Sequence, residues 1–131
     1  MKKEGILNDR VCALVARLGH GDWVVVADCG LPIPPGVWRI DLALVKGVPS
    51  FQQVVEALAA EIQVQRLVVA REMRTENPKQ HEFLKRTFPN LSIEEVPHKE
   101  FKGLASKARA VIRTGEATPY ANVILEAGVS F

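Results

Sequence analysis

The run Trp-Val-Val-Val-Ala at residues 23–27 constrains the fold more than any other segment of the chain. It is short, rich in β-branched residues and apolar at both alternating positions, which is typical of a strand covered on both faces of a sheet. Asn8 is a good helix N-cap residue. One apolar helix face follows it, at the spacing i, i+3, i+4, i+7, formed by Val11, Leu14, Val15 and Leu18. A covered strand beside an amphipathic helix indicates an α/β fold.

The same two patterns alternate along the rest of the chain. Ser50 and Gln53 form a capping box for a second helix, Asn77-Pro78 starts a third, and residues 99–107 are predicted as a short fourth. Strands separated by helices favour right-handed crossovers and a mostly parallel sheet. We therefore predict a single α/β domain over residues 1–131, a mostly parallel sheet flanked by helices. Its further strands are expected at 37–44, 66–70, 93–96, 110–112 and 120–125.

Composition excludes several classes of protein. A length of 131 residues corresponds to about one domain. The 17 Lys+Arg and 15 Asp+Glu give a net charge of +2, too balanced to indicate a nucleic-acid partner or an anionic membrane surface. No stretch approaches the roughly 18 apolar residues that span a bilayer. Cys12 and Cys29 form no CxxC pair and fit a reducing compartment, so the expected location is the cytoplasm.

Polar residues follow several of the predicted strands. In open α/β sheets, ligands bind beyond the carboxyl ends of the strands. Asp28 follows the first strand, His98 follows the strand at 93–96, and Arg113-Thr114-Gly115-Glu116 follows the next. His20, by contrast, lies on the connection that enters the first strand. Taken alone, a loop aspartate more often caps a turn and a lone histidine is more often a surface residue.

Several common motifs are absent. Gly19-His20-Gly21 has GxG spacing, but Val24 occupies the third glycine position and the strand follows the motif instead of preceding it, which excludes a dinucleotide fingerprint. There is no P-loop, no GxSxG elbow and no HExxH. Scattered His, Cys and Asp residues are a weak metal signal, so no metal is predicted. A basic stretch indicates a solvated helix face more than a phosphate site; it comprises Lys99, Lys102, Lys107, Arg109 and Arg113.

Four segments, in order along nearly the whole chain, carry a family resemblance. They are Gly5-Ile6-Leu7-Asn8, Leu18-Gly19-His20-Gly21-Asp22, Ala27-Asp28-Cys29-Gly30-Leu31-Pro32-Ile33-Pro34, and Ile112-Arg113-Thr114-Gly115-Glu116 leading to Thr118-Pro119-Tyr120-Ala121-Asn122. Together they closely resemble the D-ribose pyranase family, which belongs with the fucose mutarotases. The resemblance implies a cofactor-free isomerase that interconverts the pyranose and furanose forms of D-ribose. It also implies ring-shaped homo-oligomers, typically decamers.

The resemblance further implies a set of site residues. His20 is the expected proton donor, and the expected sugar-binding residues are Asp28, His98, Tyr120, Ala121 and Asn122. Opening a sugar ring needs a proton delivered to the ring oxygen and one removed from the anomeric hydroxyl. An imidazole, with an ordinary pKa of about 6.5, can give and take protons at neutral pH. Two alternatives stay open: a fucose-type mutarotase and a non-catalytic sugar-binding protein linked to ribose uptake.

Two questions about the site follow from these positions. Glu116 is a further carboxylate that could take part in proton transfer. His20 enters a strand whereas Asp28 and His98 leave strands, so one subunit is not expected to gather all three at one end of the sheet. The ring oligomers that the resemblance implies suggest that the site is completed across a subunit boundary, by head-to-tail contacts that place His20 and residues 120–122 on different chains. Apolar residues near the chain ends are candidate contact residues, namely Ile6, Leu7, Val129 and Phe131.

Overall fold

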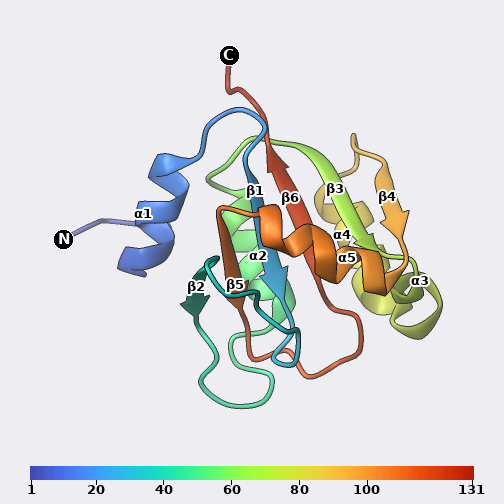
Figure 1. The fold of residues 1–131 in the computed structure, drawn as a ribbon. Helices are drawn as coiled ribbons and strands as arrows, with labels where there is room; N and C mark the ends of the chain where they lie inside the picture. Colours follow the sequence, from blue (N-terminus) through green and yellow to red (C-terminus); the bar gives the residue numbers. More distant parts are fainter.

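A computed structural model describes residues 1–131 as one six-stranded sheet with helices on both faces (Figure 1). Five strands run parallel, and β6 runs antiparallel between β1 and β3. The order across the sheet is β2-β5-β1-β6-β3-β4. The predicted α/β class with a mostly parallel sheet is confirmed. The strands are β1 (Trp23–Ala27), β2 (Trp38–Asp41), β3 (Val64–Ala70), β4 (Ile93–Val96), β5 (Ala110–Arg113) and β6 (Val123–Ala127).

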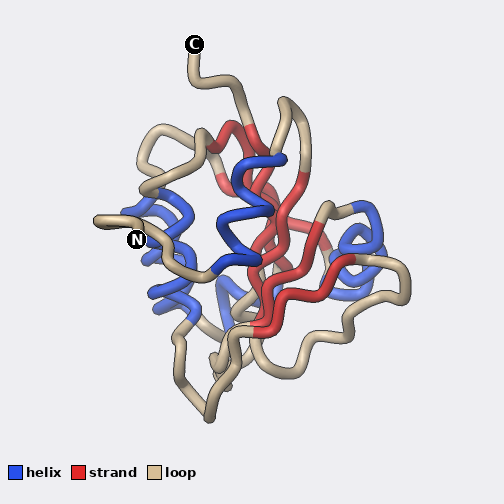
Figure 2. Tube along the Cα trace, turned by 90° about the vertical axis from the view of Figure 1, so that its left-hand side faces the viewer, coloured by secondary structure: helices blue, strands red, loops and turns tan.

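Helices and one long loop cover the sheet as two outer layers (Figure 2). The larger core lies between one face of the sheet and four helices: α1 (Asp9–Arg17), α2 (Phe51–Ala59), α3 (Glu72–Glu76) and α4 (Pro78–Thr87). The smaller core lies on the other face, beneath α5 (His98–Leu104), the 3-10 turn η1 (Ala105–Lys107) and the loop 28–37.

The position of β1 between the two cores explains why its sequence is apolar at every position. Val24 and Val26 face the larger core, whereas Val25 and Ala27 face the smaller one, and all four side chains are buried. The predicted strand with two covered faces is confirmed. Because β1 and β6 lie in the middle of the sheet, each has a hydrogen-bonded neighbouring strand on both sides, which fixes the residues at its ends.

The local signals for helix starts are confirmed. The Asn8 side chain accepts hydrogen bonds from the N–H groups of Arg10 and Val11, and α1 begins at the next residue. Ser50 and Gln53 form the predicted capping box of α2. Pro78 occupies the first turn of α4, as predicted from Asn77-Pro78. These signals depend only on neighbouring residues, so the sequence is sufficient to find them.

Two predicted strands differ most from the structure in their bounds, while those predicted at 66–70 and 110–112 differ by two residues or fewer. The strand expected at 37–44 ends at Asp41, whose carboxylate accepts a hydrogen bond from the Ala43 N–H at 3.1 Å and turns the chain. Residues 42–49 then fold back against Gly115, where any side chain would collide with the main chain of Val48. The strand expected at 120–125 begins only at Val123, so residues 120–122 form the connection into β6.

The two ends of the sheet differ in what they carry. At the carboxyl end, β1 to β5 finish and β6 begins; at the amino end, β1 to β5 begin and β6 finishes. The loop 42–49 lies at the carboxyl end and the C-terminus leaves from the amino end (Figure 1). A helix across a bilayer takes about 20 residues. The longest helix here, α4, has 10, so none of the helices can cross a membrane.

Candidate active site

Asp28 is held in place where β1 leaves the sheet. Its Oδ1 accepts a hydrogen bond from the Gly30 N–H at 2.9 Å, the contact by which a loop aspartate caps a turn. Its Oδ2 accepts one from Asn122 Nδ2 at 3.0 Å, and its own N–H donates to Asn122 Oδ1 at 2.8 Å. Asn122 is fully buried just before β6, beside the end of β1 because the two strands are antiparallel. Both polar atoms of the Asn122 side chain therefore orient Asp28.

Tyr120 lies on the same connection in an unusual conformation. Its φ of 56° makes it the one non-glycine residue of the chain with positive φ, a conformation that costs roughly 1–2 kcal/mol. The ring meets that of His98 edge-on, with centroids 5.0 Å apart and planes at 82°. The next residue, Ala121, is buried in the larger core, so it offers a ligand its main chain only.

His98 begins α5 directly after β4. Its N–H donates to both carboxylate oxygens of Glu72, at 3.1 Å each, and its ring stacks on Phe101 at 6.4 Å. The ring Nδ1 is buried without a hydrogen-bond partner. Glu72 was not predicted as a site-supporting residue, because it is 26 residues away in the chain and belongs to a helix of five residues with no apolar period.

The side chains of Asp28, His98 and Tyr120 share one pocket of about 450 Å³ at the carboxyl end of the sheet. It presents a carboxylate, an imidazole, a phenol and an ammonium group beside apolar loop residues. That mixture suits a ligand with many hydroxyls and an apolar ring face. Lys102 also lines the pocket, and only its spacing of i+4 from His98 on α5 connects it to the site in the sequence. The lining residues are Asp28, Gly30, Leu31, Pro32, His98, Lys102, Pro119 and Tyr120.

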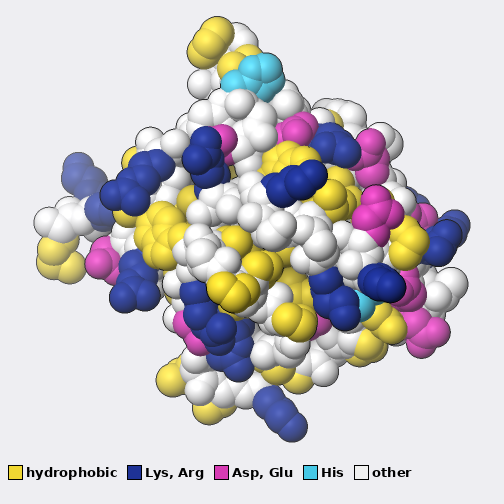
Figure 3. Space-filling view, viewed as in Figure 1, with side chains coloured by type: hydrophobic (Ala, Val, Ile, Leu, Met, Phe, Trp, Pro, Cys, Tyr) yellow, Lys and Arg dark blue, Asp and Glu magenta, His cyan; other side chains and the backbone are white.

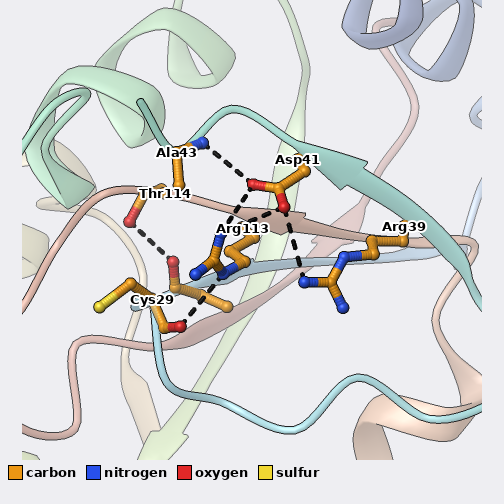
Figure 4. A network of polar contacts seen from close by, with 7 residues as sticks. Cys29, Arg39, Asp41, Ala43, Arg113 and Thr114 are labelled. Carbon is orange, nitrogen blue, oxygen red and sulfur yellow. Dashed lines mark hydrogen bonds and ion pairs between the residues drawn. The ribbon is translucent and has the colours of Figure 1, made fainter. Parts of the chain in front are cut away.

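Arg113 braces the loop that follows Asp28 (Figure 4). Its Nε donates to the Cys29 carbonyl at 3.1 Å, and its Nη1 donates to both carboxylate oxygens of Asp41 at 3.1 Å. Partial burial raises the pKa of Asp41, but the Ala43 N–H and the Arg113 guanidinium together hold that pKa below its ordinary value. Arg113 therefore stabilises the main chain beside the pocket and does not line the pocket itself.

The predicted basic helix face lies on the side of the sheet that carries α5. Lys99, Lys102 and Lys107 are exposed there, as a solvated face requires. Figure 3 shows Lys and Arg side chains spread over this face, with acidic side chains gathered toward β4 and α3. Arg109 and Arg113 are not free, because they pair with Asp22 and Asp41.

His20 lies at the amino end of the sheet, away from the pocket. It is exposed, and its Nε2 is 3.1 Å from Gln65 Oε1 on β3. The adjacent Gly21 N–H donates to the Ala127 carbonyl at the end of β6. The five residues of β1 separate His20 from Asp28, a span of about 17 Å that exceeds the width of a monosaccharide ring. A single chain therefore does not bring His20 to the pocket.

Asp22 shapes the turn that presents His20. One carboxylate oxygen accepts a hydrogen bond from the Gly19 N–H at 2.8 Å, and the other accepts one from Arg109 Nε at 3.0 Å. The pKa of Asp22 lies below its ordinary value of 3.8, mainly because of the hydrogen bond from the Gly19 N–H and also because of the hydrogen bond from Arg109.

We expect Asp22→Asn to lower the free energy of unfolding at pH 7 by about 1 kcal/mol. Because the pKa of Asp22 is lower in the folded state, ionisation stabilises the fold fully above the unfolded pKa, and this contribution disappears as pH falls through the folded pKa. The difference between wild type and variant should therefore shrink in acid. Urea unfolding at pH 7 and pH 3 measures it, with Glu56→Gln on the exposed side of α2 as control. An equal difference at both pH values would exclude ionisation of Asp22 as its source.

The remaining titratable groups do not cluster. No group of three or more His, Cys, Asp or Glu side chains lies close enough to hold a metal ion. Both cysteines are free thiols; Cys12 Sγ lies 3.0 Å from the Ile6 carbonyl, to which it donates.

Comparison with known proteins assigns the family. The family model described as "RbsD / FucU transport protein family" matches residues 1–130. The chain belongs to this family. Within the RbsD / FucU family, the D-ribose pyranase of Bacillus licheniformis is 54% identical over 131 residues, which is 100% of both chains. The D-ribose pyranase of Geobacillus thermodenitrificans is 53% identical over 100% of this chain and 99% of that protein. The resemblance of the four sequence segments to the D-ribose pyranase family is confirmed.

Two solved structures have the same fold as this chain. The structure of Bacillus subtilis RbsD complexed with D-ribose matches with a TM-score of 0.97 at 50% identity, covering 100% of both chains. The fucose mutarotase of Streptococcus pneumoniae, solved in complex with L-fucose, matches with a TM-score of 0.78 at 19% identity, covering 95% of each chain. The second match shows a shared fold.

Proposed function

We propose that this protein catalyses the D-ribose pyranase reaction, the interconversion of the pyranose and furanose forms of D-ribose. The observation that carries the proposal is the 54% identity, over the full length of both chains, to a protein named D-ribose pyranase. The similarity of the fold to B. subtilis RbsD, solved with D-ribose, supports the same substrate. A fucose-type mutarotase is the weaker candidate, because the fucose mutarotase is only 19% identical to this chain.

The reaction needs two proton transfers and an oriented ring. The pyranose opens when the anomeric hydroxyl loses its proton and the ring oxygen gains one, and the resulting aldehyde closes again through a different hydroxyl. We assign His20 as the proton donor to the ring oxygen. Asp28, held by Gly30 and Asn122, accepts hydrogen bonds from neighbouring sugar hydroxyls and orients the ring. His98 and Tyr120 bind the sugar from the other wall of the pocket.

Ala121 and Asn122 lie next to the pocket residues without lining the pocket themselves. Both are completely buried, and the Asn122 amide is bonded to Asp28. We assign Asn122 the role of orienting the Asp28 carboxylate. Ala121 contributes through its main chain, since its side chain belongs to the larger core.

The active unit is proposed to be a homo-oligomeric ring, a decamer as the resemblance implies. His20 and the pocket lie at opposite ends of the sheet, so a head-to-tail contact would bring the amino end of one subunit to the pocket of the next. We propose that each site is completed in this way, with His20 supplied by a neighbouring subunit.

Exposed apolar side chains at both ends of the sheet suit such a contact. Leu44, 77% exposed, lies with Val45 and Val48 in the loop 42–49 at the carboxyl end. Val129 and Phe131 are exposed beyond β6 at the amino end, and Leu7 is exposed near the N-terminus. Ile6, the fourth residue expected from the sequence, packs instead against the larger core of its own chain. Leu44, Val45 and Val48 lie close together in one loop, as apolar residues of a contact surface do.

The cytoplasm is the proposed location. Cys12 and Cys29 are both free thiols, and both are partly accessible to solvent. A reducing compartment keeps such thiols from oxidising.

Saturation-transfer NMR of D-ribose tests the proposed reaction. Saturating one pyranose anomeric signal should reduce the furanose signals faster with the protein than with the sugar alone. The same measurement on L-fucose separates the alternatives. Acceleration for fucose and not for ribose would identify a fucose-type mutarotase. Ribose binding without any acceleration would identify a sugar-binding protein.

We expect Asp28→Asn to weaken ribose binding by roughly ten- to a hundredfold, because a charge-assisted hydrogen bond to the sugar is lost. The substituted amide nitrogen would also face a donor, either the Gly30 N–H or Asn122 Nδ2. Titration of ribose followed by ligand NMR measures the dissociation constant. Asp9→Asn, an exposed aspartate in the first turn of α1, is the matched control. A dissociation constant unchanged from wild type would remove Asp28 from the sugar contacts.

A further inference from the structure

Glu116 is a buried carboxylate that the proposed reaction does not use. It is 8% exposed and does not line the pocket. Its Oε1 accepts a hydrogen bond from the N–H of Phe51, the first residue of α2, at 3.0 Å, and its Oε2 accepts one from the Thr118 hydroxyl at 2.9 Å. Its carbonyl accepts a further bond from the Cys29 N–H at 2.8 Å, beside Asp28. With both carboxylate oxygens engaged away from the pocket, Glu116 is not placed for proton transfer to a sugar.

Asn77 holds the same segment from the other side. Its Nδ2 donates to the Thr118 hydroxyl at 2.9 Å and to the Pro119 carbonyl at 2.7 Å, and the residue is 7% exposed. An asparagine before a helix normally caps it, but the Asn77 side chain makes no capping hydrogen bond to α4. The amide is committed to the segment before Tyr120 instead.

These contacts form one directed chain of hydrogen bonds, from the Asn77 amide to the Thr118 hydroxyl to the Glu116 carboxylate. Bonds that run in one direction polarise and strengthen one another. The two ends of the chain, Asn77 and Glu116, are buried, whereas Thr118 between them is exposed. Thr118, the middle member of the chain, lies two residues before Tyr120. The positive φ of Tyr120 is a strained conformation that persists only where its surroundings fix it.

We propose that the chain formed by Asn77, Thr118 and Glu116 is a positioning device that holds Tyr120 against His98 and thereby sets the affinity for the monosaccharide. The helix α3 supports the same arrangement, since Glu72 at its start holds the His98 N–H and Asn77 follows its end. These residues act through Tyr120 and do not touch the sugar. The link to affinity rests on the proposed function; the effect on Tyr120 does not.

Thr118→Val tests the proposal, because it removes the hydroxyl and keeps the shape of the side chain. Tyr120 is the only tyrosine of the chain, so tyrosine-selective labelling gives a single NMR probe of its ring. We expect the Tyr120 signal to shift or broaden in the sugar-free variant. The dissociation constant for ribose should rise roughly tenfold, with kcat within about twofold of wild type. Thr118→Ser, which retains the hydroxyl, should restore both.

Thr87→Val is the matched control. Its hydroxyl bonds to the Phe83 carbonyl within α4, so the control loses one partly buried hydrogen bond away from the site. It should leave the Tyr120 signal and ribose affinity unchanged. Glu116→Gln, which removes the charge at the end of the chain, is the second variant should Thr118→Val not fold.

The possible outcomes are distinguishable. An unchanged Tyr120 signal in Thr118→Val overturns the proposal, as does a shifted signal with unchanged affinity. A fall in kcat at unchanged KM would assign the chain to catalysis and also overturns it. If the wild type binds ribose without accelerating its interconversion, the proposed function fails, yet the Tyr120 signal and the dissociation constants still decide the positioning role.

Discussion

Replacing His20 with alanine should slow the interconversion of ribose ring forms by roughly 10²-fold or more, the contribution of a positioned acid–base group. The fold should survive, because His20 is exposed and its ring makes one hydrogen bond, to Gln65 Oε1 at 3.1 Å. Ribose should still bind, since Asp28, His98 and Tyr120 form the pocket at the other end of the sheet. Line broadening or saturation transfer on the sugar signals measures the exchange rate.

The matched control for this variant is His81→Ala. His81 lies on α4 and does not line the pocket of Asp28, His98 and Tyr120, so its loss should leave exchange at the wild-type rate. Circular dichroism and light scattering should show the same fold and assembly for both variants. Near-normal exchange with His20→Ala, in a folded and assembled protein, would mean that another group donates the proton.

The sequence predicts those parts of the site that depend on position along the chain. Asp28 follows a strand whose apolar pattern is unmistakable, so its place at the carboxyl end of the sheet follows from the strand itself. His98 is predicted in the same way from the strand before it. His20 precedes the same strand that Asp28 follows, and the opposite placement of the two residues is therefore also predictable.

The parts that the sequence does not predict depend on contacts between distant segments. Residues 120–125 have the apolar pattern of a strand, but Tyr120 has a left-handed conformation, and the residue before it bonds to Asn77, about forty residues earlier in the chain. Asn122 pairs with Asp28 across 94 residues of chain. The helix α3 has five residues and a single buried side chain, Met73, so the sequence shows no helical period of apolar residues that would predict it. The position of β6 between β1 and β3, and its antiparallel direction, depend on the order of strands in the sheet. Local sequence patterns do not encode that order.

Mixing two inactive variants should restore activity if neighbouring subunits share each site. His20→Ala lacks the proposed proton donor at the amino end of the sheet, and Tyr120→Ala lacks a pocket residue at the carboxyl end. In rings formed from equal amounts of the two, about a quarter of the interfaces should combine an intact His20 with an intact pocket, because each head-to-tail contact takes one end from each subunit. Exchange of ribose ring forms should therefore recover to about a quarter of the wild-type rate.

A second mixture makes this test specific. His98→Ala and Tyr120→Ala both alter the pocket of their own chain, so every interface in their mixed rings carries one defect and no activity should return. Subunit exchange must be verified in both mixtures, by mass spectrometry of the intact assemblies. If mixed assemblies of His20→Ala and Tyr120→Ala form and remain as inactive as this control, His20 and the pocket do not meet across a subunit boundary. Because β1 keeps the two ends of one sheet about 17 Å apart, His20 would then have no route to the sugar and its role as proton donor would fall as well.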